Sequence, residues 1–133
     1  MRIPTLIAIL FLSVWSLTAC KGTEAPAVVE ISREDYVRTA PGNSLVLDVR
    51  TPEEFAAGHV ENALNIPHDR LAERLPEIQQ FATAPVVVYC KSGRRAGLAT
   101  ELLAEAGFTN LRHLTGDMDG WIAAGYPVEK DGP

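Results

Sequence analysis

The stretch from Val86 to Arg95 reads Val-Val-Val-Tyr-Cys-Lys-Ser-Gly-Arg-Arg. Its first four residues form an apolar run that is typical of a strand buried on both faces. Cys90 follows directly, and Gly93 allows a tight turn before a helix begins. The pattern therefore predicts a strand, a short loop and a helix. It places the cysteine at the carboxyl end of the strand, which is where open α/β sheets bind ligands.

Segments on both sides of this stretch continue the alternation of strands and helices. Leu45–Val49 predicts a second buried strand, and weaker strand patterns lie at 28–31, 63–66 and 111–114. Helices are expected in five segments with start or stop signals: 33–40 after Ser32, 52–57 in the capping box Thr51-Pro52-Glu53-Glu54, 70–81 with a break at Pro76, the segment from Arg95 to Gly107, and 118–124. This order predicts a small α/β domain with a mostly parallel five-stranded sheet and helices on both faces.

The overall composition narrows the classes of protein that fit. The chain has 133 residues, a net charge of −5 and 47% hydrophobic residues, which suits one globular domain. The acidic charge argues against a nucleic-acid partner, because nucleic-acid binding needs a basic surface. Two cysteines are too few for a disulfide-based fold, and a single apolar segment excludes a polytopic transporter.

The first twenty residues are expected to lie outside this domain. After Arg2, residues 3–20 carry no charge, and their long apolar core is typical of a secretory signal. The end of the segment, Leu-Thr-Ala-Cys at 17–20, resembles a bacterial lipobox. That resemblance implies cleavage before Cys20, lipidation of Cys20 and a lipid-anchored periplasmic or otherwise extracytoplasmic protein, with Lys21 implying the outer membrane. A simple signal peptide and a retained membrane helix are the alternatives.

The expected organisation thus has three parts: a signal peptide at 1–19, a lipidated amino terminus and polar tether at 20–27, and a folded domain at 28–130. Residues 128–133 are expected to fray. With Cys20 lipidated, Cys90 is the single free thiol of the mature chain. A single unpaired thiol is unusual in an oxidising compartment, so it indicates a chemical role for Cys90. A small buried core residue is the alternative role for this cysteine.

The residues around Cys90 favour its thiolate form. The helix that follows begins with N–H groups that have no partner inside the helix, and Lys91, Arg94 and Arg95 add positive charge nearby. The thiolate is the nucleophilic form of cysteine. The same N–H groups and cations would hold an incoming anion. The stretch is therefore expected to be a nucleophilic, anion-binding site.

The loop Cys90-Lys91-Ser92-Gly93-Arg94-Arg95 resembles the active-site loop of rhodanese sulfurtransferases. Further segments along the domain carry the likeness: Leu47–Phe55, Gly58–Pro67, Leu114–Gly116, Trp121, Gly125 and Pro127. The closest type is the single-domain, secreted bacterial rhodanese. Asp117 stands where many members of the family have a second glycine. The resemblance therefore does not predict the conformation of the turn at this position.

The resemblance implies a sulfurtransferase without a metal or cofactor. Cys90 would be the catalytic nucleophile that takes the outer sulfur of thiosulfate as a persulfide, and a thiophilic acceptor, cyanide or a thiol, would remove it. Substrate-binding residues would be those of the loop: Lys91, Ser92, Gly93, Arg94 and Arg95. The only expected contact with a membrane is the lipid anchor.

Three other functions remain as alternatives. The first is a persulfide carrier that serves one partner protein. The second is a relative of phosphatases and arsenate reductases, in which five residues separate the cysteine from the arginine. Here four residues separate Cys90 from Arg95, which in the family goes with a pocket sized for one sulfur atom. The third is a non-catalytic rhodanese-like module, although such modules usually lose the cysteine that this chain retains.

Other polar residues are assigned structural roles. Asp48, Arg50 and Glu54 lie around the end of a neighbouring strand. Arg50 and Glu54 are spaced to pair and brace the loop, and Asp48 is expected to orient backbone groups near the site. No metal-ligand spacing links the three histidines, which are His59, His68 and His113.

Overall fold

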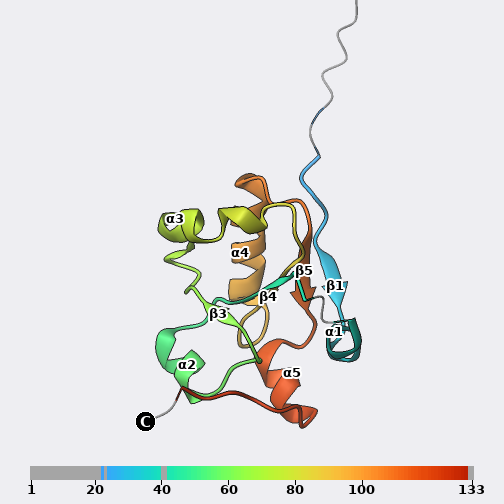
Figure 1. Cartoon of the computed structure of the whole chain (residues 1–133), viewed down its shortest axis with the longest axis vertical. Coiled ribbons are helices and arrows are strands. Elements are labelled where there is room, and N and C mark those ends of the chain that lie inside the picture. Colours follow the sequence, from blue (N-terminus) through green and yellow to red (C-terminus); the bar gives the residue numbers. More distant parts are fainter. Residues whose placement is uncertain (1–21, 23, 40–41, 132–133) are drawn as a thin grey trace, which may run out of the picture.

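The computed structural model describes residues 22, 24–39 and 42–131 (Figure 1). The predicted signal peptide, Cys20 and Lys21 lie outside the described residues. Five strands form one sheet, and every strand pair in it is parallel, with the order β1-β5-β4-β2-β3. The strands are β1 Val29–Ile31, β2 Leu45–Asp48, β3 Leu64–Asn65, β4 Val86–Tyr89 and β5 Leu111–Leu114. The predicted α/β fold class is confirmed.

Helices connect the strands: α1 Arg33–Thr39, α2 Pro52–Ala57, α3 Leu71–Arg74, α4 Arg94–Glu105 and α5 Asp117–Ala123, with 3₁₀ turns η1 Leu75–Glu77 and η2 Gln79–Phe81. The segment 70–81 is broken as predicted, because Pro76 cannot donate a helical hydrogen bond. The side chain of Ser32 accepts the N–H of Asp35, which caps α1. None of the described helices is long and apolar enough to cross a bilayer.

The alternation of side chains along the strands divides the core into two layers. In β4, Val86 and Val88 pack with α3 and α4, while Val87 and Tyr89 pack with α1 and α5. All four side chains are at most 1% exposed. This burial on both faces explains why the run contains no charged residue.

The arrangement of the strands decides where the cysteine lies. Parallel strands bring all their carboxyl ends to one edge of the sheet. β4 lies between β5 and β2, so the loop that begins at Cys90 stands at the centre of that edge. Residues 24–28 enter β1 from the opposite edge, as the blue trace in Figure 1 shows.

Glu129 is bound to the domain, so the expectation that residues 128–133 fray is wrong at this position. His59 and Glu129 exchange two backbone hydrogen bonds of 2.9 Å. The His59 ring also stacks on Phe55, with 3.7 Å between the ring centroids. The terminal position suggested fraying, and the sequence does not reveal that the fold brings His59 alongside Glu129.

Candidate active site

Cys90 is held rigidly at the end of β4. Its N–H donates to Oδ1 of Asp117 at 2.9 Å, and its carbonyl accepts the N–H of Met118 at 2.9 Å. The N–H of Gly93 donates to the Cys90 Sγ at 3.0 Å. Cys90 is only 1% exposed and joins the core layer below α4. A plain core cysteine has apolar neighbours, whereas this sulfur accepts a backbone N–H, which stabilises a thiolate.

Gly93 gives the loop its shape. Its φ is +115°, a left-handed conformation that side-chain-bearing residues rarely adopt. A Cβ at this position would lie 3.2 Å from Oδ2 of Asp117, so the loop also packs closely on that carboxylate. Arg94 and Arg95 begin α4, and their N–H groups have no acceptor within the helix. The loop therefore brings the positive end of a twelve-residue helix to the sulfur.

The three cations of the loop are in different environments. The Nζ of Lys91 lies 3.1 Å from the carboxylate of Asp119, and both side chains are exposed. The two terminal nitrogens of Arg95 donate to the two carboxylate oxygens of Glu54 at 2.7 and 3.0 Å. Arg94 is exposed, and the described part of the chain offers it no carboxylate within ion-pair distance. Of the predicted substrate-binding cations, Arg94 is thus the one whose charge is least compensated.

The predicted pairing of Arg50 with Glu54 is wrong. Arg50 binds Asp48 instead: its Nη2 lies 2.7 Å from Oδ2, and its Nε lies 3.0 Å from both carboxylate oxygens. Asp48 also accepts the N–H of Arg50, so it orients this backbone group. The spacing argument applies only inside a helix, and Arg50 precedes Thr51, the N-cap of α2.

Glu54 braces the loop through a different partner. The capping box fixes it: the Thr51 N–H donates to the Glu54 carboxylate, and the Glu54 N–H donates to the Thr51 hydroxyl. Arg95 then donates to both oxygens of this carboxylate, including the Oε2 that accepts the Thr51 N–H. The hydrogen bond from Arg95, reinforced by the bond from Thr51, lowers the pKa of Glu54 to about 2. The sequence identified Glu54 as a residue that braces the loop. It did not identify Arg95, which lies in a different element, as the partner of Glu54.

Replacing Glu54 with glutamine should expose this charge effect. Glutamine keeps the capping hydrogen bonds, so we expect Glu54→Gln to lower the free energy of unfolding at pH 7 by only about 1 kcal/mol. The carboxyl pKa falls from 4.5 to about 2 on folding, so its stabilisation is present above pH 4.5 and is lost as the pH falls toward 2. Urea unfolding of both proteins across this range checks it. A difference that stays constant with pH would contradict the assignment.

Sequence reasoning did not assign Asp117 and His113 to the site. Asp117 is 1% exposed and adopts a φ of +54°, a left-handed conformation that residues with a side chain rarely adopt. His113 Nε2 lies 3.0 Å from Asp117 Oδ2, and His113 Nδ1 lies 2.9 Å from the Glu30 carboxylate. The hydrogen bond to Asp117, together with both negative charges, raises the pKa of His113 to about 9. The departure at position 117 from the pattern that the family resemblance implies was the one signal of this contact in the sequence.

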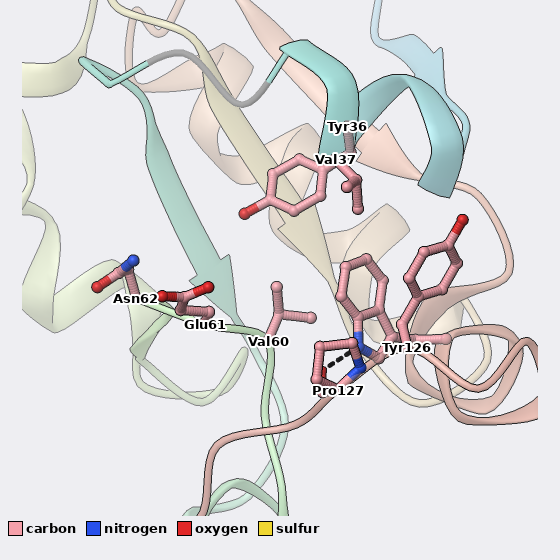
Figure 2. A pocket seen from close by; sticks show the side chains of 8 residues that line it. Tyr36, Val37, Val60, Glu61, Asn62, Tyr126 and Pro127 are labelled. Atoms are coloured by element: carbon pink, nitrogen blue, oxygen red, sulfur yellow. Dashed lines mark hydrogen bonds between the residues drawn. The ribbon is translucent and has the colours of Figure 1, made fainter.

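A separate hollow lies between α1, α5 and the carboxyl-terminal segment (Figure 2). It has a volume of about 220 Å³ and is lined by Tyr36, Val37, Val60, Glu61, Asn62, Trp121, Tyr126 and Pro127. Trp121 forms part of its wall and donates its indole N–H to the carbonyl of Pro127 at 2.9 Å. No residue of the Cys90 loop lines this hollow. The Cys90 loop and the hollow are therefore distinct features of the domain.

Comparisons with known proteins identify relatives of this chain and solved structures with the same fold. A thiosulfate sulfurtransferase, PspE of Escherichia coli, is 38% identical over 73 residues, which cover 55% of this chain and 70% of that protein. A tRNA uridine(34) hydroxylase of Salmonella paratyphi B is 30% identical over 122 residues, which cover 80% of this chain and 35% of that protein. The crystal structure of a rhodanese-related protein from Thermoplasma volcanium has a TM-score of 0.68 and 30% identity. The match between the two structures covers 77% of this chain and 99% of the Thermoplasma volcanium chain. Because the model of the Rhodanese-like domain family also matches residues 34–124, the chain belongs to that family of sulfurtransferase-related domains.

Proposed function

We propose that this chain is a thiosulfate sulfurtransferase that carries sulfur as a persulfide on Cys90. The observation that carries the proposal is the 3.0 Å hydrogen bond from the Gly93 N–H to the Cys90 Sγ, at the amino end of α4. A thiolate held in this way is a nucleophile whose attack needs no separate base. The sulfurtransferase relatives support the choice of reaction.

In the first step the Cys90 thiolate attacks the outer sulfur of thiosulfate. A new sulfur–sulfur bond forms at Cys90 while the sulfur–sulfur bond of thiosulfate breaks, and sulfite leaves with the bonding electron pair. We assign the stabilisation of the departing charge to the guanidinium of Arg94, which is exposed at the start of α4, and to the first N–H groups of that helix. The N–H groups of the loop then hold the terminal sulfur of the persulfide.

In the second step a thiophilic acceptor attacks the terminal sulfur. With cyanide, a carbon–sulfur bond forms while the sulfur–sulfur bond of the persulfide breaks, so thiocyanate leaves and the electron pair returns to Cys90 as its thiolate. A thiol acceptor would leave as a persulfide in the same way, with its proton released to solvent. Over the two steps one sulfur atom passes from donor to acceptor and the enzyme returns to its starting thiolate, so the cycle needs no external oxidant or reductant.

Steady-state kinetics test this proposal. Two half-reactions that share one persulfide predict parallel double-reciprocal lines when thiosulfate and cyanide are varied, and mass spectrometry should find one extra sulfur on the Cys90 peptide. Converging lines without the persulfide would reject the mechanism. Release of p-nitrophenol from p-nitrophenyl phosphate that depends on Cys90 would favour the phosphatase alternative. Mixed disulfides from cells that join Cys90 to one partner protein, with negligible thiosulfate turnover, would favour the carrier.

We also propose that Cys20 is lipidated and holds the protein outside the cytoplasm. The support is the uncharged segment at 3–20 and its ending Leu-Thr-Ala-Cys. More than one acyl chain on that residue would anchor the chain stably, whereas a single chain binds a membrane only marginally. In a bacterial host, Cys20→Ser should move the protein from the membrane fraction to the soluble fraction or leave an uncleaved precursor. Unchanged processing and membrane association would contradict this proposal.

A further inference from the structure

A buried carboxylate lies directly behind the nucleophile. Asp117 Oδ1 accepts the N–H of Cys90 at 2.9 Å, and Oδ2 lies beneath Gly93, whose own N–H binds the Cys90 Sγ. Asp117 is 1% exposed, so water does not screen its charge. A negative charge in this position opposes a neighbouring thiolate. The Asp117 carboxylate would therefore disfavour the Cys90 thiolate unless a nearby positive charge compensates it.

His113 is placed to compensate that charge. The titratable groups that face its ring among the described residues are Asp117 from α5, at 3.0 Å, and Glu30 from β1, at 2.9 Å. The Glu30 side chain is 63% exposed and solvent-screened, whereas that of Asp117 is 2% exposed. A pKa of about 9 keeps His113 protonated at neutral pH. The pair of buried Asp117 and partly buried His113 is then electrically neutral.

We infer that Asp117 and His113 act together as positioning residues: the Asp117 carboxylate fixes the backbone of Cys90, and protonated His113 prevents that carboxylate from suppressing the Cys90 thiolate. The inference rests on the proposed function in one respect, since it takes the thiolate to be the working form. A glycine at position 117 would leave the Cys90 N–H without this acceptor. It would also leave His113 without its buried partner.

The test is the rate at which iodoacetamide alkylates Cys90, measured across pH on the Cys90 peptide by mass spectrometry. His113→Gln keeps a hydrogen-bond donor for Asp117 and removes the positive charge. We expect it to slow alkylation at pH 7 by about tenfold and to move the midpoint of the pH profile upward by about one unit. The double variant His113→Gln with Asp117→Asn removes both charges and should recover the wild-type rate within about twofold.

The double variant separates electrostatics from packing. If the two residues only held the loop in place, the double variant would alkylate as slowly as His113→Gln or more slowly, and the inference would be rejected. An unchanged profile for His113→Gln would reject it as well. Thermal unfolding of each variant confirms that folded proteins are compared. Alkylation does not require sulfur transfer, so a wild-type protein inactive toward thiosulfate would reject the proposed function while the alkylation profiles still decided the inference.

Discussion

Replacing Cys90 with serine should lower thiosulfate:cyanide turnover by more than about a thousandfold, because the persulfide cannot form on a hydroxyl group. Serine differs from cysteine by one atom, and the 3.0 Å hydrogen bond from Gly93 can pass to the hydroxyl oxygen. The fold should therefore survive, and thermal unfolding should show a small shift. The assay is thiocyanate release at saturating thiosulfate, with the variant and wild type prepared identically.

Two measurements make the Cys90 result decisive. The Cys90→Ser protein should gain no sulfur after incubation with thiosulfate, whereas wild type should gain one sulfur atom on the peptide that contains Cys90. Gln80→Ala serves as a control outside the site, because Gln80 is exposed and lies in η2 rather than in the Cys90 loop. It should keep most of the activity. Full activity in Cys90→Ser would refute the covalent mechanism.

The second large effect concerns the buried pair of Asp48 and Arg50. Both residues are nearly inaccessible, with 0% and 5% exposure, and Arg50 also donates to the carbonyl of Gly58 at 2.7 Å. Arg50→Met leaves the Asp48 carboxylate buried without its counter-charge. We therefore expect a loss of about 3–5 kcal/mol in the free energy of unfolding, measured by urea denaturation.

Arg70→Met is the matched control, because it makes the same chemical change in a pair with Glu73 whose side chains are 63% and 66% exposed. That variant should lose less than about 0.5 kcal/mol. If Arg50→Met is too unstable to purify, the double variant Asp48→Leu with Arg50→Met removes both charges and should recover much of the loss. Equal losses for Arg50→Met and Arg70→Met would show that burial does not govern the pair.

The sequence predicted those features that depend on neighbours in the chain. The strand before Cys90, the capping box at Thr51 and the break at Pro76 follow from patterns a few residues long. The partners of Glu54 and Arg50 were mistaken, because an i,i+4 rule was applied across a helix boundary. The contacts of Asp117 with Cys90 and His113 could not be derived, since the fold alone brings residues from separate elements together.

The parallel sheet determines which side of the domain would face a surface to which its amino-terminal end is attached. Residues 24–28 enter β1 at one edge of the sheet, and the Cys90 loop stands at the other (Figure 1). A surface attached at that end would face the edge of the sheet opposite the Cys90 loop. The loop would then face away from that surface, so the surface would not block the approach of donors and acceptors, including the thiol of another protein. Coupling to a bead through the amino end should consequently preserve turnover.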